Sequence, residues 1–578
     1  MKEKLKSFFT ISSFKQLFPY ILIGLVVAML EVFGELLDVL QGVNHGLPGY
    51  SLDIKEILTL GGEALGWWIF ISLLLFLGWR GFGKIYRGRS SKFVFFGNRL
   101  KCWLVIMISW LPCFLAYFPC IYSYDGEPQL IQYITRSFDN HHPILHTLII
   151  GWCYDLGQWL TSKGINIDGM AFYSIIQMSL LAFALATMIK YMYERKSGRF
   201  SLWMILLIAA LFPTMPIMAI STTKDTFFAA LFVLLIVSFL ELLDEEDRIK
   251  LKRRSFKIGI YAVLCMLFRR NVCYVFILLI LIGGAAFLSY EIKCGIKNIQ
   301  EQKISYKTVV FMKRFLIISC LSLMVFLVSE KTLMMMTHAV QGEAAEALSV
   351  PLMQMARAYK SNSCEVTEKY GDVLFSYVSE KGLNNYRPLI SDGVKQGFNN
   401  NLFAKDKKDF FKLYFGMLKD YPGSFIQAFL YMTKGDWELL DTSYIEVYKD
   451  WWRDRTGYLI TDATPVFAQR YVNKSNLLPK VRAFYENIVT YCSFEKDFLI
   501  QILFAPALYV LLVLLNGIAL KKENEKEKLL IWFVPALYLL TVLAGPCVLV
   551  RYIFPFMLLI PLLGSMIFTH YEPKKSMI

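Results

Sequence analysis

Residues 143–160 read PILHTLIIGWCYDLGQWL, an apolar stretch that begins at a proline and is interrupted by Asp155 and Gln158. A helix that crosses a bilayer needs about 20 predominantly apolar residues, whereas a helix with one polar face lies in the membrane interface. If this stretch crossed the bilayer, the basic loops before and after it would fall on opposite sides. We therefore interpret it as an interfacial helix, which places all the basic loops on one side.

The side of the membrane on which the basic residues lie depends on that interpretation. They concentrate in short runs between apolar segments, such as residues 80–101, 248–257 and 521–528. Lys and Arg mark the cytoplasmic loops of membrane proteins. With residues 143–160 at the interface, both chain termini are cytoplasmic and residues 331–497 are extracytoplasmic. The net charge of +15 is then explained without a nucleic-acid partner.

The other apolar stretches predict an all-α polytopic membrane protein. Of all residues 56% are hydrophobic and only 19% are charged, where soluble domains carry about 25%. We expect about twelve transmembrane helices, judged by the length a span requires. They are placed at 18–37, 62–79, 102–119, 169–191, 201–219, 225–243, 256–268, 272–290, 313–330, 498–519, 529–546 and 551–569.

These stretches divide the chain into four parts. Residues 1–100 hold two N-terminal transmembrane helices and a basic cytoplasmic loop, and residues 101–330 hold the main transmembrane module with the interfacial helix in its first long external loop. Residues 331–497 form a mostly helical extracytoplasmic domain, and residues 498–578 hold the C-terminal transmembrane helices. The 11 cysteines lack zinc-type spacing, so we expect neither a metal cluster nor a disulfide framework. A pairing of Cys364 with Cys492 is left open.

Two acidic residues follow the span at 102–119. Asp125 and Glu127 lie beside Gly126 and Pro128, which favour a turn. A carboxylate at a membrane surface can act as a general base or as a metal ligand. The alternative is a solvated loop acid or a helix N-cap.

Half of the six histidines lie close together in the same loop, as His141, His142 and His146. A histidine pair can bind a metal or a phosphate, or hold a carboxylate in place. The alternative is a set of polar residues that cap the helix beginning at Pro143. Zinc is not favoured, because only His142 and His146 share a helical face and no H-E-x-x-H motif is present.

Lys224 and Asp225 follow the hydroxyl run 221–223 at the outer end of a predicted span. Together they suit a phosphate and a metal or an acceptor hydroxyl. The alternative is that the two side chains pair with each other.

Three arginines are predicted to lie on the same outer side. Arg269 and Arg270 depart from the positive-inside trend, and arginine forks match phosphate oxygens. Arg551 begins the last span, where the alternative role is an interfacial anchor. In the external domain, a predicted helix after residue 351 places Gln354 and Arg357 one turn apart.

Five short motifs resemble a poorly characterised bacterial branch of the GT-C class of membrane glycosyltransferases, over roughly residues 100–570. They are Tyr124-Asp125, Asn140 to Pro143, Thr223 to Asp225, Ser349 to Arg357 and Arg551 to Pro555. That class has an acid in the first long external loop, often an interfacial helix that begins at a His-Pro type motif, and a second acid in the next external loop. The chain departs from the branch in its two additional N-terminal spans and in the spacing of Glu127.

The resemblance implies a polyprenyl-phosphate-linked sugar as donor and an envelope polymer, lipid or protein as acceptor. Independently of the resemblance, inverting transfer needs a base that deprotonates the acceptor hydroxyl, and we expect Asp125 to be that base. The expected catalytic residues are Asp125, Asp225, Glu127 and His142. The expected substrate-binding residues are His141, Lys224, Arg269, Arg270, Arg551, Gln354 and Arg357.

The need for a cofactor is left open by these residues. Asp125 and Asp225 are the candidate ligands of a divalent cation, Mg²⁺ or Mn²⁺. A lipid monophosphate leaving group needs no metal where cationic side chains supply the charge.

Three other functions compete with sugar transfer. A multi-span transporter or lipid flippase of envelope precursors would explain the number of spans, but transporters usually show two pseudo-symmetric halves and none is evident here. An envelope-polymer polymerase or ligase would share the substrates. A non-catalytic assembly protein would use the external domain as its interaction surface.

Overall fold

The described parts of the protein are helical. Its structure, a computed structural model, describes residues 11–44, 54–87, 94–122, 125–245, 247–296, 306–439, 477–494, 502–523 and 525–568. Within these ranges the regular elements are helices, and extended segments meet only in isolated bridges. The predicted all-α class is confirmed.

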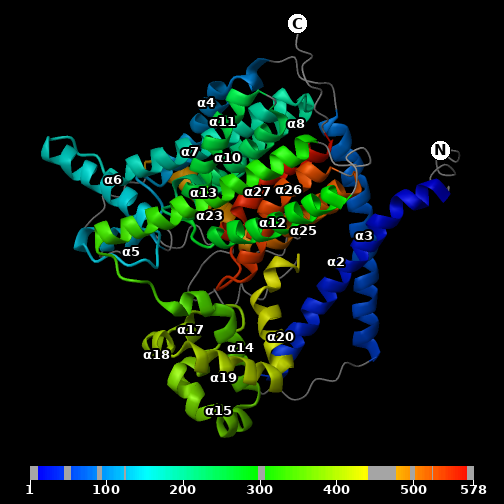
Figure 1. Ribbon diagram of the computed structural model, residues 1–578, viewed down its shortest axis with the longest axis vertical. Helices are drawn as coiled ribbons and strands as arrows, with labels where there is room; N and C mark the ends of the chain where they lie inside the picture. Colours follow the sequence, from blue (N-terminus) through cyan, green and yellow to red (C-terminus); the bar gives the residue numbers. More distant parts are fainter. Residues whose placement is uncertain are drawn as a thin grey trace.

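Most of the helices fall into two groups, a large bundle and a small domain. A large bundle contains α4 (Arg99–Ala116), α5 (Gly126–Thr135), α6 (Ile144–Ser162), α7 (Gly169–Glu194), α8 (Arg199–Leu211), α9 (Thr214–Ile220), α10 (Lys224–Asp244), α11 (Arg248–Phe268), α12 (Val272–Ile296), α13 (Tyr306–Thr337), α25 (Pro506–Lys522), α26 (Lys526–Leu543) and α27 (Val550–Phe568). A small domain contains η4 (Ala344–Leu348), α14 (Ser349–Ser361), α15 (Ser363–Tyr377), α16 (Glu380–Asn384), α17 (Asp392–Lys395), α18 (Asn400–Lys405), α19 (Lys407–Asp420), α20 (Pro422–Met432) and η5 (Lys434–Asp436). Figure 1 shows the small domain below one end of the bundle.

Eight helices in the described ranges are long and apolar enough to cross a membrane. They are α4, α7, α10, α12, α13, α27 and the N-terminal pair α2 (Ile11–Asn44) and α3 (Ile54–Tyr86). The pair α8 and α9 passes the same test as one span bent by 51°. The expected count of twelve is not confirmed. Charged residues occupy the first turns of α11 and α26, and α25 has only 17 residues.

Helix α10 forms the centre of the bundle. Its apolar residues run around its whole circumference, and 94% of its candidate span is buried. A helix that is hydrophobic on every face is a core helix or a membrane span, and its burial shows that α10 lies in the core of the bundle. Phe228 and Phe232 pack against Tyr538 of α26, with ring centroids 5.0 and 5.3 Å apart. The first turn of α10 is therefore held rigidly at one end of the core.

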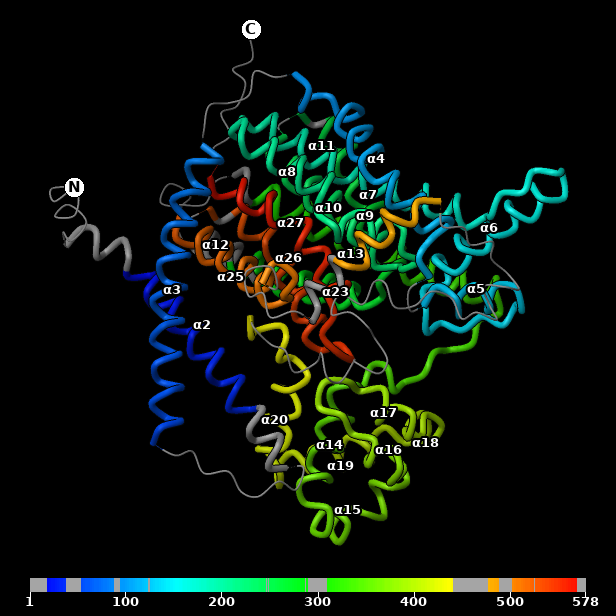
Figure 2. Tube along the Cα trace, turned by 180° about the vertical axis from the view of Figure 1, so that it is seen from behind, coloured from blue at the N-terminus to red at the C-terminus, as the bar shows by residue number. Residues whose placement is uncertain are grey.

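The N-terminal helices α2 and α3 lie beside the bundle, and α2 reaches the small domain (Figures 1 and 2). The Glu31 carboxylate accepts the backbone N–H of Leu439 at 2.7 Å, and the Tyr431 hydroxyl donates to the Leu37 carbonyl at 2.7 Å. These contacts give the first of the two additional spans a structural role, because they tie the small domain to α2.

The small domain has its own core around α14, where Leu352, Met353 and Ala356 are fully buried. It differs from the expected external segment at its C-terminal end. Helix α23 (Pro479–Phe494) was expected in this domain, but it packs on α4 of the bundle. There the Leu477 N–H donates to the Leu115 carbonyl at 3.3 Å. Cys364 is exposed, while the side chain of Cys492 lies outside the described residues.

Candidate functional site

Backbone hydrogen bonds join two loops at the end of the bundle that faces the small domain. The Ile121 N–H donates to the Ile220 carbonyl (3.0 Å), and the Thr222 N–H donates to the Ile121 carbonyl (2.8 Å). A Cβ added to Gly126 would lie 2.0 Å from Thr222 Oγ1, so this close approach requires glycine. The loop that begins α5 and the loop that begins α10 are therefore locked together.

Helix capping affects the two candidate acids differently. The Thr223 hydroxyl accepts the Asp225 N–H (3.3 Å) and caps α10, so Lys224 is the first residue of that helix. Asp125 occupies the N-cap position of α5, but its side chain makes no capping hydrogen bond. The alternative interpretation of Asp125 as a helix cap is therefore not supported.

Asp125 lies among positively charged and imidazole groups from three separate segments. Its Oδ2 is 2.8 Å from Lys224 Nζ, 3.5 Å from Arg551 Nη1 and 3.8 Å from His142 Nδ1. Burial acts to raise the pKa of Asp125, but Lys224, His142 and Arg551 together hold that pKa well below its usual range. Asp125 is therefore a carboxylate at neutral pH.

Asp225 is fully buried behind this first group. It forms an ion pair with Arg269, accepts a hydrogen bond from the Thr223 hydroxyl at 3.2 Å, and lies 3.8 Å from Arg551 Nε. The guanidinium of Arg551 thus bridges Asp125 and Asp225. Both acids and all their cationic partners form one continuous network.

Aromatic rings hold Arg269 in place. Its guanidinium carbon lies 4.7 Å from the ring centroid of Tyr552 and 5.6 Å from that of Tyr538. Such contacts stabilise a buried cation through the negative face of the ring. The Tyr552 hydroxyl also accepts a hydrogen bond from Arg551 Nη2 at 3.1 Å. The arginine side chains are therefore preorganised.

The network carries one excess positive charge. Three cations, Lys224, Arg269 and Arg551, face two carboxylates. Burial lowers the pKa of His142 to about 3, so this imidazole is neutral near pH 7. A partly buried site with a positive excess attracts anions.

A cavity of about 1150 Å³ opens beside the network, between the bundle and the small domain. From the bundle it is lined by Asp125, His141, His142, Lys224, Arg269, Arg270 and Arg551. The facing wall comes from the small domain, and the Ser391 N–H donates to the Pro546 carbonyl (3.1 Å) where the two parts meet. Apolar residues of α12 and α13 form a third wall, including Leu278 and Phe326.

Most of the expected site residues are brought together, but three are not. Glu127 lies in the first turn of α5 and does not line the cavity. Gln354 bonds to the Phe425 carbonyl (3.1 Å) within the small domain. Arg357 is buried in the same domain, where it donates to Gln427 Oε1 at 3.1 Å. Tyr124 of the Tyr-Asp motif lies outside the described residues.

Arg270 and His141 line the outer part of the cavity. Arg270 is half exposed and pairs with Glu330 of α13, with 3.3 Å between Nε and the carboxylate oxygen. His146, in contrast, is fully buried away from the cavity. Its ring nitrogens bond to Gln129 (2.9 Å) and to the Tyr173 hydroxyl (2.8 Å), which is the arrangement of a structural core histidine.

The residues present do not fit a divalent metal ion. Within the described ranges, no group of three or more His, Cys, Asp and Glu side chains could hold one. Hard cations need several oxygen ligands, but Asp125 and Asp225 are already surrounded by Lys224, Arg269 and Arg551. These cations supply the positive charge that a metal would otherwise bring.

The small domain contributes residues that sequence reasoning missed. Lys395 is largely buried at the cavity wall, and its Nζ lies 2.8 Å from both Glu346 and Asp392. Asn385 and Arg387 line the same wall. None of these residues belongs to a recognisable motif, so only the position of the small domain brings them to the site.

The sequence was compared with known proteins. No curated protein matches the chain, and no solved structure matches it. A protein family described as "Family of unknown function (DUF6020)" matches residues 128–577, which is most of the chain. The chain therefore belongs to the DUF6020 family.

Proposed function

We propose that the protein is a membrane glycosyltransferase that moves a sugar from a polyprenyl-phosphate donor to a cell-envelope acceptor on the extracytoplasmic face. One observation carries the proposal. The Asp125 carboxylate lies at hydrogen-bond distance from Lys224 and next to Arg551 at the edge of a large cavity. That arrangement combines a proton acceptor with the cations that a phosphate leaving group requires.

The cations suit the donor phosphate. In the absence of substrate they neutralise Asp125 and Asp225, and the site retains one excess positive charge. A phosphate in the cavity would draw Lys224 and Arg551 toward its own oxygens, because charge-assisted bonds to phosphate are strong. Withdrawal of those cations raises the proton affinity of Asp125. Donor binding thereby prepares the base for the acceptor.

The reaction follows from these positions. The acceptor hydroxyl attacks the anomeric carbon of the sugar and gives its proton to Asp125. The bond between that carbon and the phosphate oxygen breaks, and the polyprenyl phosphate leaves with the electron pair. Lys224, Arg551 and Arg269 stabilise the negative charge that develops on the phosphate, while Asp225 holds the two arginines in place.

The apolar wall of the cavity suits the lipid part of the donor. Tyr274 and Leu278 of α12 face Phe326 and Leu333 of α13 along this wall. Tyr274 is 54% exposed, so the wall is open at its outer edge. A polyprenyl chain placed here would keep contact with the bilayer while its phosphate reaches the arginines.

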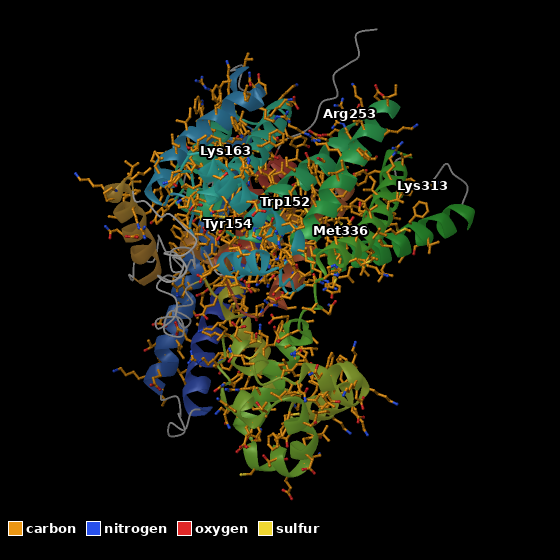
Figure 3. All side chains as sticks on the ribbon, turned by 90° about the vertical axis from the view of Figure 1, so that its left-hand side faces the viewer. Trp152, Tyr154, Lys163, Arg253, Lys313 and Met336 are labelled. Carbon is orange, nitrogen blue, oxygen red and sulfur yellow. The ribbon has the colours of Figure 1, made fainter. Side chains whose placement is uncertain are left out.

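The proposal includes a topology. The basic residue Arg253 lies toward the end of the bundle away from the small domain (Figure 3). By the positive-inside rule that end is cytoplasmic, together with both termini, and the cavity faces outward. Helix α6 carries exposed Trp152 and Trp159 and projects from the bundle beside α5, which suits an interfacial helix (Figure 2).

The decisive experiment compares the wild type with Asp125→Asn in purified form. The substrates are a polyprenyl-phosphate sugar with labelled sugar and an envelope acceptor fraction. We expect Asp125→Asn to lower transfer at least about a hundredfold, because it removes the base, while the variant folds normally. Asp420→Asn, which changes a carboxylate on the small-domain surface, serves as the control.

Two results would contradict the proposal. Unchanged sugar transfer by Asp125→Asn would show that Asp125 is not the base. A wild type that moves lipid-linked precursor across vesicle membranes without transferring sugar would instead identify the protein as a transporter or lipid flippase.

A further inference from the structure

A second cavity runs along the outside of the bundle between α11 and α13. Its volume is about 790 Å³. Its lining residues recur every three or four positions along each helix, so each helix contributes one continuous face. Phe256 of α11 is 73% exposed and Ile317 of α13 is 50% exposed, which shows that the cavity is an open groove with apolar edges.

One end of this groove is basic. Lys252 of α11 and Lys313 and Arg314 of α13 line it there. Among the described residues, no carboxylate forms an ion pair with any of these three side chains. Arg254, elsewhere on α11, is by contrast paired with Glu241 at 3.4 Å. The groove therefore presents positive charge to a ligand.

The groove has the length of one lipid chain. Its lining on α11 extends from Lys252 to Leu264, which corresponds to roughly 18 Å of helix. One leaflet contributes about 15 Å of hydrocarbon, half of the bilayer core. Its floor includes Gly259, where an added Cβ would lie 3.8 Å from Ser322 Oγ. The absence of a side chain at this position keeps the groove deep.

We propose that this groove binds one anionic phospholipid from the leaflet opposite the candidate site. Its phosphate contacts Lys252, Lys313 and Arg314, and one acyl chain lies along α11 and α13. Lys252 and Lys313 lie near the starts of α11 and α13, whereas residues near the ends of these helices, Phe268 and Glu330, line the candidate site, as this assignment requires. The assignment rests on charge complementarity and does not depend on the transfer reaction.

Native mass spectrometry of the purified full-length protein tests this proposal. The probes are phosphatidylglycerol and phosphatidylcholine with identical acyl chains, titrated into delipidated protein. We expect the wild type to bind one phosphatidylglycerol in preference to phosphatidylcholine. The double variant Lys313→Gln/Arg314→Gln should weaken that binding on the order of tenfold, since each basic residue near an anionic lipid contributes appreciably. Gly259→Leu should weaken both lipids by filling the groove.

Arg253→Gln is the matched control. Arg253 lies next to Lys252 on α11 but does not line the groove, so this variant removes the same charge outside it. We expect its phosphatidylglycerol affinity to equal that of the wild type. Elution volume and melting temperature show whether each variant is folded. If Gly259→Leu does not fold, the charge variants alone test the proposal.

Three outcomes would overturn the proposal. Equal affinity of the wild type for both lipids would show that the groove does not select an anionic headgroup. An equal loss in Arg253→Gln and in the double variant would show only a general surface effect. Full lipid retention by the double variant, with displacement by polyprenyl phosphate, would assign the groove to the donor tail instead.

Discussion

Lys224 Nζ lies 2.8 Å from Asp125 Oδ2, although the two residues are 99 positions apart in the chain. The ion pair joins the start of α10, the most buried of the candidate spans in the described residues, to the first loop after α4. In the proposed reaction this pair must open, because Lys224 moves to the donor phosphate while Asp125 receives the acceptor proton. The chemical role of each partner can be tested separately.

Lys224→Gln should impair donor use. It removes the cation closest to Asp125, so we expect the KM for the polyprenyl-phosphate sugar to rise about tenfold and kcat to fall about a hundredfold. Steady-state kinetics with varied donor give both constants. Lys224→Arg should restore part of the lost activity. The control Lys369→Gln, on the small-domain surface, should leave KM and kcat unchanged. A normal donor KM in Lys224→Gln would exclude a phosphate contact.

Asp225→Asn should destabilise the protein more than Asp125→Asn. Asp225 is fully buried and pairs with Arg269, whereas the Asp125 side chain is 17% exposed. Removing one partner of a buried pair costs about 3–5 kcal/mol, because the remaining charge is left uncompensated. Thermal denaturation in detergent measures the difference. The double variant Asp225→Asn/Arg269→Gln should be more stable than Asp225→Asn alone; equal stability would mean that the pair is not coupled.

Acid should destabilise the protein through His142. Its folded pKa of about 3 lies below the ordinary value of 6.5, so between these values the unfolded chain binds the proton and the folded protein does not. Stability is therefore complete above about pH 6.5 and is lost as the pH falls, by about 2 kcal/mol between pH 7 and pH 5. His146, which burial shifts in the same direction, adds to this loss.

The melting temperature of His142→Gln should depend less steeply on pH than that of the wild type. Exposed His338 provides the control, as His338→Asn, because asparagine tolerates the positive φ of 53° at that position. If the melting temperatures of the wild type and His142→Gln change with pH in parallel, the imidazole of His142 is not buried in its neutral form.

Sugar transfer should persist without a divalent metal. Lys224, Arg269 and Arg551 surround the two carboxylates that would otherwise hold one. We expect the initial rate in excess EDTA to remain close to that without chelator. A loss of activity that Mg²⁺ or Mn²⁺ restores would show that Asp125 and Asp225 bind a metal when substrate is present.

Local sequence pattern was sufficient for several elements. The apolar run of α10 and the polar interruptions of α6 each act within a few helical turns. The pattern was less informative where a helix mixes charged and apolar turns. Helices α11 and α26 are continuous but carry charged residues in their first turns. The pattern therefore predicted a helix at each place, but these helices do not count among the candidate membrane spans.

By itself the sequence determined the helical class, the apolar helices and the residue types that suit phosphate chemistry, because backbone hydrogen bonding and hydrophobic periodicity are local. Only the tertiary structure decided which of those residues meet. It brought Arg551 of the last helix between Asp125 and Asp225, placed Lys395 at the cavity wall, and kept Arg357 inside the small domain. The reason is physical: a buried charge needs a partner, and the partners here come from helices that pack together although they are distant in sequence.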